Sequence, residues 1–153
     1  MPLTSFAIQN RLFETLQRKG HEIICPNYTP AHWFESDVFS ITSAGYSVEH
    51  EIKLTVQDFE RDALKGDGSK HRRLAAGDPH GPKYFWFVVP EGMETKITVP
   101  EWAGLKMAVV YGRSIRTRIA KKAPALHSVK VDSKVLDHVR GIFYWRFWNL
   151  RRK

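Results

Sequence analysis

The stretch YSVEHEIKLTVQDFERD, residues 46–62, decides the fold prediction because its pattern changes from alternation to a helical period. Successive side chains of a strand point to opposite faces of a sheet. One face of the predicted strand carries residues suited to a core: Tyr46, Val48, His50 and Ile52. The other face carries three charges: Glu49, Glu51 and Lys53. Packing alone does not explain a row of charges in mid-strand, so we expect this face to have a function.

The flanking segments extend the pattern on both sides. Downstream, the segment from Thr55 to Asp58 has the form of a capping box and predicts a helix through about residue 65. Its expected buried stripe is Val56, Phe59 and Ala63. Upstream, residues 34–41 predict a strand on which Asp37, Phe39 and Ile41 share one face. Gly45 marks a turn between the two strands, which predicts a hairpin.

The remaining elements predict a single α/β domain over residues 1–153. Residues 3–19 have the apolar spacing of an amphipathic helix, with Ile8, Leu12 and Leu16 on the stripe. Further strands are expected at 21–25 (stopped by Pro26), 83–90, 105–111 and 115–119, and a C-terminal helix at 132–150. This order indicates a mixed β-sheet flanked by helices. Residues 66–82, with four glycines and two prolines, are expected to form a flexible basic loop.

Composition excludes several classes of protein. A chain of 153 residues is one domain's worth, and no apolar run approaches the roughly 18 residues of a membrane helix. Cys25 is the only cysteine, which excludes an internal disulfide and a zinc site built on paired cysteines. The N-terminus lacks the pattern of a secretion signal. We therefore expect no membrane association and a cytoplasmic location.

The charge is unevenly distributed along the chain. The net charge is +8, but residues 1–101 hold 11 basic and 14 acidic side chains, whereas residues 102–153 hold 13 and 2. This asymmetry favours a polyanionic partner for the C-terminal third, together with a separate cluster of carboxylates. We expect the affinity of this basic third for a polyanion to fall steeply as the salt concentration rises, because neutralising phosphates releases counterions.

The predicted hairpin brings two carboxylates together. Asp37 and Glu51 fall on one face of adjacent strands, and the carbonyl of Ile52 offers a third oxygen. Oxygen ligands of this kind suit Mg²⁺, which keeps several waters. Lys53, on the same face, would orient or deprotonate an attacking water and offset the charge of a phosphate. The combination predicts metal-dependent hydrolysis of a phosphodiester.

These residues resemble the active-site signature of the PD-(D/E)XK nuclease superfamily, which has the restriction-endonuclease-like fold. The stretch EIKLTVQDFERD (51–62) is similar to one in small phage and bacterial nucleases, including the MmcB-like DNA-repair group. The resemblance continues through FWFVVPEG (85–92), VPEWAGL (99–105) and KKAPALH (121–127). It departs at Ser36, where the nominal motif has proline. It also departs at the first helix, where many relatives have a glutamate that assists the metal, because Glu14 lies on the side of this helix away from its apolar stripe.

The resemblance implies a Mg²⁺- or Mn²⁺-dependent deoxyribonuclease, with Asp37 and Glu51 as metal ligands and Lys53 as the catalytic lysine. Glu49 and Gln57 are accessory candidates, Glu49 as a further metal ligand or a solvated partner for Lys53. We expect Asp62 to pair with a nearby arginine or lysine rather than to bind metal. The resemblance also implies a bacterium or a phage-infected host cell as the setting. DNA is the expected partner, and RNA is not excluded.

Two basic groups are candidates for contacts with nucleic acid. One is in the predicted loop: Lys70, His71, Arg72 and Arg73. The other is at and after the last predicted strand: Arg113, Arg116, Arg118, Lys121 and Lys122. If Ile115, Thr117 and Ile119 face inward, Arg116 and Arg118 project together toward phosphates.

The C-terminal segment RGIFYWRFWNLRRK leaves three uses open for its aromatic side chains. They can stack on unpaired bases, pack as a core stripe with Val135, Val139, Ile142 and Phe143, or form the interface of a homodimer. For the whole protein, the alternative to a nuclease is a non-catalytic nucleic-acid-binding module with a vestigial metal site. A basic scaffold protein is a third possibility, and it needs none of the carboxylates.

Overall fold

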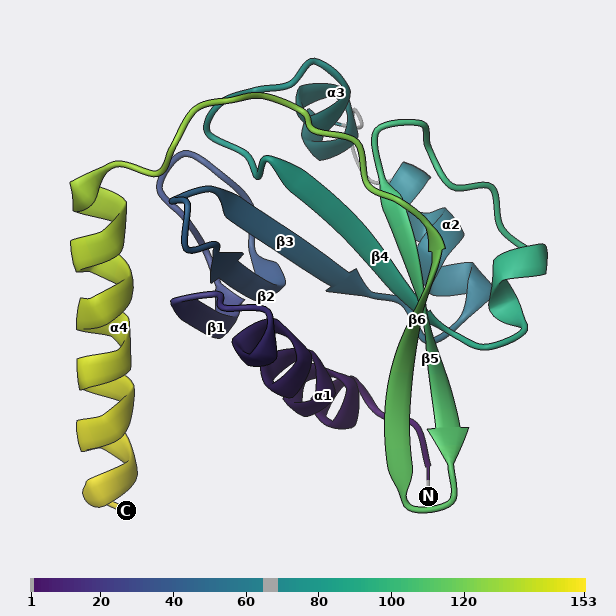
Figure 1. The fold of residues 1–153 in the computed structure, drawn as a ribbon, viewed down its shortest axis with the longest axis horizontal. Helices are drawn as coiled ribbons and strands as arrows, with labels where there is room; N and C mark the ends of the chain where they lie inside the picture. The colour runs from purple at the N-terminus through teal and green to yellow at the C-terminus, as the bar shows by residue number, and fades with distance from the viewer. Residues whose placement is uncertain (1, 65–68) are drawn as a thin grey trace.

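The computed structural model describes residues 2–64 and 69–153 and contains one six-stranded mixed sheet with helices on both sides (Figure 1). The strands are β1 (Ile23–Tyr28), β2 (Ser36–Ile41), β3 (Ser47–Ile52), β4 (Tyr84–Pro90), β5 (Gly104–Tyr111) and β6 (Ser114–Lys121). They lie in sequence order, with β3, β4 and β5 parallel and the other neighbours antiparallel. The helices are α1 (Ser5–Arg18), α2 (Val56–Leu64), α3 (Ser69–Ala75) and α4 (Ser133–Arg151), with a short 3-10 helix, η1 (Met93–Thr95). The α/β class and the mixed sheet are confirmed.

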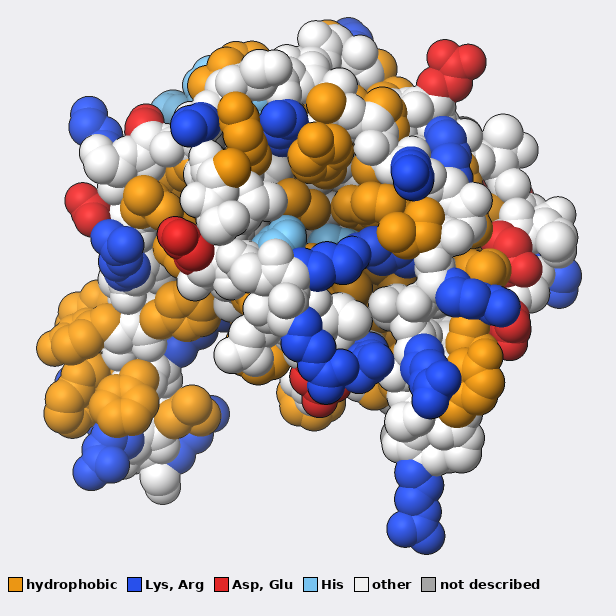
Figure 2. Space-filling view, in the orientation of Figure 1, with side chains coloured by type: hydrophobic (Ala, Val, Ile, Leu, Met, Phe, Trp, Pro, Cys, Tyr) orange, Lys and Arg blue, Asp and Glu red, His pale blue; other side chains and the backbone are white. Residues whose placement is uncertain are grey.

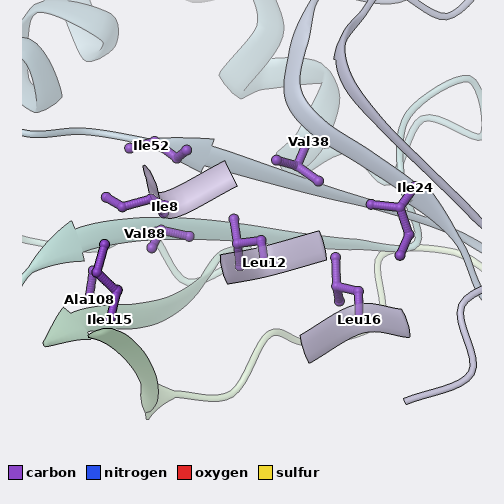
Figure 3. Packing of buried hydrophobic residues seen from close by; sticks show 9 residues of the cluster. All are labelled: Ile8, Leu12, Leu16, Ile24, Val38, Ile52, Val88, Ala108 and Ile115. Atoms are coloured by element: carbon purple, nitrogen blue, oxygen red, sulfur yellow. The ribbon is translucent and has the colours of Figure 1, made fainter. Parts of the chain in front are cut away.

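Helix α1 covers one face of the sheet through the predicted stripe. Thr4 caps the helix, because its hydroxyl accepts a hydrogen bond of 3.1 Å from the N–H of Ala7. Figure 3 shows the helical side chains pointing onto the strands, in a cluster of Ile8, Leu12, Leu16, Ile24, Val38, Ile52, Val88, Ala108 and Ile115. Burying each large aliphatic side chain contributes roughly 1.5–3 kcal/mol, which fixes α1 against the central strands.

The opposite face is covered by α2 and α3 over an aromatic core. Phe59 of α2 and Leu74 of α3 pack with Phe85 and Phe87 of β4. Strand β4 lies between β3 and β5 and is buried on both faces, as its continuous apolar sequence predicts. The hairpin of β2 and β3 is also confirmed, with Gly45 at a φ of +90° in its turn.

Helix α4 lies beside the β1 edge of the sheet, and its C-terminal end projects beyond it (Figure 1). Val139 is buried against Cys25 and Phe39, whereas Phe143, expected in the same stripe, is 38% exposed. The helix contacts the body along a narrow strip, so its last turns leave large apolar side chains at the surface: Phe143, Tyr144, Trp145, Phe147, Trp148 and Leu150. Dimerisation through these side chains stays a prediction.

Several expected boundaries were wrong. Strand β1 does not stop at Pro26 but continues to Tyr28, because β1 is an edge strand and its outer N–H groups need no partner. Residues 69–75 form helix α3 rather than a flexible loop, since burial of Leu74 stabilises the helix. Residues 65–68 of the expected loop lie outside the described part.

Two residues that were expected to face the core are exposed instead. Ala63 is exposed on α2. Ile119 is exposed as well, at the rim of a cavity described below.

None of the helices in the described ranges combines the length and apolar character needed to cross a lipid bilayer.

Candidate active site

The hairpin register brings the two predicted metal-binding carboxylates together. Val38 pairs with His50, so the next position along β2 and β3 sets Asp37 opposite Glu51. The main-chain N–H of Ile52 donates a hydrogen bond of 2.7 Å to Oδ2 of Asp37, which holds this carboxylate at the end of β3. Burial raises the pKa of Asp37, and the neighbouring charge of Glu51 raises it further, while the Ile52 N–H opposes the shift.

Lys53 lies immediately after β3 and binds two acids. Its N–H donates to the carbonyl of Val88, which continues the pairing with β4 beyond the last residue of the strand. Its Nζ lies 2.9 Å from Oε1 of Glu51 and also contacts Asp62 of α2. Burial lowers the pKa of Lys53, but these carboxylates outweigh burial and hold the pKa above its ordinary value. The expected pairing of Asp62 with a lysine is confirmed, and Lys53 is an ammonium in this arrangement.

A second lysine bridges the two glutamates of β3. Nζ of Lys70, on α3, lies 2.6 Å from Oε1 of Glu49 and 2.6 Å from Oε2 of Glu51. Glu49 is only 1% exposed, and its other oxygen accepts a hydrogen bond of 2.9 Å from Nε1 of Trp33. Burial raises the pKa of Glu49 to about 7, although Lys70 acts in the opposite direction. For Lys70, burial lowers the pKa, but the two glutamates outweigh burial and hold the pKa above its ordinary value.

The charged row on β3 is thus a compact network of opposite charges. Glu51 lies between the ammonium groups of Lys53 and Lys70, so both of its carboxylate oxygens already contact a positive charge. The described residues contain no group of three or more His, Cys, Asp and Glu side chains that could hold a metal ion. A cation here would rely on the carboxylates of Asp37 and Glu51, the main-chain carbonyl of Ile52, and water.

The other predicted accessory residues lie in different surroundings. Glu49 is buried in the pair with Lys70 rather than solvated beside Lys53. Gln57 is exposed on the first turn of α2. Glu14 is exposed on α1 and pairs with Arg11 at 2.8 Å, as its position on the helix suggested.

Two neighbours of the site were not anticipated from the sequence. Gln9 of α1 donates a hydrogen bond of 2.9 Å to the carbonyl of Asp37. Trp33, in the segment before β2, donates a hydrogen bond to Glu49. The sequence separations of these two residues from the site give no local pattern that would have placed them here.

His71, predicted to contact nucleic acid, lies on α3 and packs beside Trp102, with ring centroids 5.1 Å apart. Burial lowers its pKa, while Asp62 and Glu51 raise it.

The first basic group is ordered on α3. Lys70 faces the glutamates rather than open solvent. Arg73 lies over the ring of Trp33 at 4.7 Å and binds Asp78 at 2.6 Å, so its guanidinium is occupied by protein groups. Arg72 is exposed on the same helix. In this group, Lys70 and Arg73 therefore contact other protein groups, and Arg72 lies at the surface.

The second basic group is divided between two faces of the sheet. The register pairs Glu51 with Phe87, Val89 with Met107, and Met107 with Arg118. Since paired residues share a face, and Phe87 and Val89 lie two apart on β4, Arg116 and Arg118 lie on the same face as Glu51. Arg118 binds Glu91, just after β4, at 2.7 Å.

The remaining members of that group do not extend this row, although Lys121 pairs with Leu105 on the same face. Nζ of Lys121 donates to the carbonyl of Pro100 at 2.7 Å. Lys122 lines a cavity beside α1, and Arg113 lies in the turn between β5 and β6. The expected continuous row therefore reduces to Arg116 and Arg118 on the face of the carboxylates.

Comparison with known proteins bears on the fold of the chain. No protein-family model and no curated protein matches the chain. A protein of unknown function from Silicibacter pomeroyi is similar in structure, with a TM-score of 0.66, 18% identity, and coverage of 99% of this chain and 94% of that one. A repair endonuclease from Pyrococcus abyssi gives a TM-score of 0.37 at 17% identity, covering 63% of this chain and 43% of that one. The first likeness shows a shared fold over nearly the whole length of both chains.

Proposed function

We propose that this protein is a Mg²⁺- or Mn²⁺-dependent nuclease of the PD-(D/E)XK type that hydrolyses phosphodiester bonds in DNA. The observation that carries the proposal is the convergence of Asp37, Glu51 and Lys53 at the end of β3. Two acids and one amine from adjacent extended segments meet there, on the face that also carries Arg116 and Arg118.

The residues present fit a divalent cation. Glu51 lies 2.9 Å from the ammonium of Lys53 and 2.6 Å from that of Lys70, so a bound ion would share its carboxylate with these lysines. Asp37, Glu51 and the carbonyl of Ile52 would hold the ion. When bound, such an ion polarises a phosphate and makes its bound water more acidic.

The lysines and arginines supply the rest of the chemistry. Lys53 is held protonated by its carboxylates, so it acts as a hydrogen-bond donor that orients water and a phosphate oxygen, and it offsets charge developing in the transition state. Lys70 opposes the rise in the pKa of the buried Glu49 and sets the position of Glu51. Arg116 and Arg118 would contact phosphates along the same face.

Conservative variants test the assignment. Asp37→Asn keeps an oxygen for the Ile52 N–H, Glu51→Gln keeps the shape of the side chain, and Lys53→Met keeps its length. Each variant is assayed for cleavage of supercoiled plasmid, a single-stranded DNA oligonucleotide and an RNA of the same sequence, with Mg²⁺, Mn²⁺ or EDTA. Glu14→Gln, an exposed acid outside the site, is the matched control.

We expect Mg²⁺- or Mn²⁺-dependent cleavage that falls at least about 100-fold in each of the three site variants, since each removes a group acting on the transition state. DNA binding, measured by fluorescence anisotropy in EDTA, should be retained. Cleavage that survives all three substitutions would falsify the proposal. DNA binding by a wild-type protein that cleaves nothing with either metal would instead favour the non-catalytic binding module.

A further inference from the structure

A cavity of about 310 Å³ opens on the α1 face of the sheet, opposite the face of the candidate active site. Leu16, at the end of α1, and Val48, Trp86 and Ile119 form much of its apolar wall. Figure 2 shows this hollow, where histidine and lysine or arginine side chains gather among apolar ones. The volume is within the range of small-ligand sites, which are mostly apolar with a few polar groups.

Two basic side chains are buried in its floor. His50 is 0% exposed and Lys106 is 5% exposed, and Nζ of Lys106 lies 2.8 Å from Nε2 of His50. The His50 ring is stacked on Trp86 at an interplanar angle of 7°, and Lys106 lies over the same indole at 4.6 Å. Nδ1 of His50 is buried without a hydrogen-bond partner among the described residues. Such groups are costly to bury unless something satisfies them.

Further basic groups surround this pair, and no acid lines the cavity within the described part of the chain. Lys19, His21 and Lys122 complete the basic lining. Burial, together with the nearby charge of Lys19, lowers the pKa of Lys106 from 10.5 to about 7. The pKa of His21 is lowered by burial and then by Lys106 and Lys19. All the charged neighbours of Lys106 and His21 that shift their pKa are therefore of like sign, in contrast to the carboxylate-rich opposite face.

We propose that this cavity binds a small organic anion, in which a phosphate or carboxylate group meets Lys106 and the flanking Lys19 and Lys122 while an apolar or aromatic body packs on Trp86 and Ile119. An anion here would supply the missing counter-charge, and charge-assisted hydrogen bonds are stronger than neutral ones. The apolar wall explains why the body of the ligand should be apolar, and the volume limits it to about the size of a mononucleotide.

The site is distinct from the proposed nuclease centre. His50 and Glu51 are adjacent in β3, but they point to opposite faces of the sheet. Binding can therefore be measured in EDTA without any cleavage, so failure of one proposal leaves the other intact.

NMR titration of the isotopically labelled full chain at pH 7 tests the proposal. The probes are inorganic phosphate, deoxyadenosine 5′-monophosphate, benzoate, and neutral deoxyadenosine as the control ligand. We expect at least one of the two organic anions to bind with a Kd of about 1 mM or tighter and to shift the amide signals of His50, Trp86 and Lys106. A stronger effect of the nucleotide identifies a phosphate ligand, and a stronger effect of benzoate identifies a carboxylate.

Lys106→Met should weaken that binding about tenfold or more, since it removes a buried charged partner. Lys122→Met changes an exposed residue at the rim and should weaken the binding less. Because this change removes no buried side chain, it tests the site even if Lys106→Met fails to fold. Lys134→Met, an exposed lysine on α4, is the matched control and should bind as the wild type does.

Three results would overturn the proposal: no shift with either organic anion, equal binding of deoxyadenosine and its monophosphate, or unchanged binding in both Lys106→Met and Lys122→Met. Inorganic phosphate that binds as tightly as the organic anions would overturn the role given to the apolar wall.

Discussion

Replacing Lys106 with methionine removes a buried amine while keeping the length of the side chain, and we expect the change to flatten the pH dependence of stability. The pKa of Lys106 is lowered from 10.5 to about 7 by burial and by Lys19. His50 and His21 also face this amine and share its basic surroundings. In the unfolded chain, the lysine regains its ordinary pKa.

The sign follows from proton binding. Between about pH 7 and 10.5 the unfolded chain holds a proton on Lys106 that the folded chain has lost, so the free energy of unfolding rises with pH in this window. With these two pKa values, the rise between pH 7 and pH 9 is about 2 kcal/mol. Well below pH 7 both states bind the proton, and this contribution becomes constant.

Urea unfolding at pH 7, 8 and 9 measures the effect. We expect the stability of the wild type to gain about 2 kcal/mol relative to Lys106→Met over this range, and Lys134→Met to follow the wild type. Titrating groups elsewhere cancel in the comparison. A difference between wild type and Lys106→Met that stays constant from pH 7 to pH 9 would show that Lys106 remains charged in the folded protein and refute the reasoning.

Three other outcomes are expected. Affinity for DNA should fall steeply between low and moderate salt, and Arg116→Ala and Arg118→Ala should each reduce the slope of log K against log salt by about 1, as measured by anisotropy; a flat affinity would argue against this surface. Trp33→Phe should lower the free energy of unfolding by about 1–3 kcal/mol in urea melts, because it leaves a buried oxygen of Glu49 unsatisfied. Val139→Ala should cost about 1–3 kcal/mol and increase hydrogen exchange along α4, since this is the fully buried side chain through which the helix packs; unchanged exchange would contradict that role.

The central pair of the candidate site could be predicted because both of its causes are local. Alternation along residues 46–53 fixes which side chains share a face, and a turn at Gly45 makes the two strands antiparallel neighbours. Asp37 and Glu51 can then lie near each other, and the register found in the structure sets them opposite. The amphipathic stripe of α1 and the buried β4 follow from local periodicity in the same way.

Local composition was misleading where a tertiary contact changed its meaning. Residues 69–75 have the basic, polar composition of a loop, but Leu74 enters the aromatic core and Lys70 finds two carboxylates, which makes a helix favourable. Pro26 ends an internal strand but not an edge strand, and only the strand order shows that β1 is at the edge.

The sequence alone therefore determined most of the elements, though not helix α3, together with the faces of the strands and the hairpin that brings Asp37 and Glu51 together. The tertiary structure decided which distant charges meet, such as Lys70 with the two glutamates of β3, and Lys106 with His50, 56 residues away. The physical reason is that periodicity and turn chemistry act over a few residues. Charges far apart in the chain meet only where the strand order and the packing of the helices bring them together.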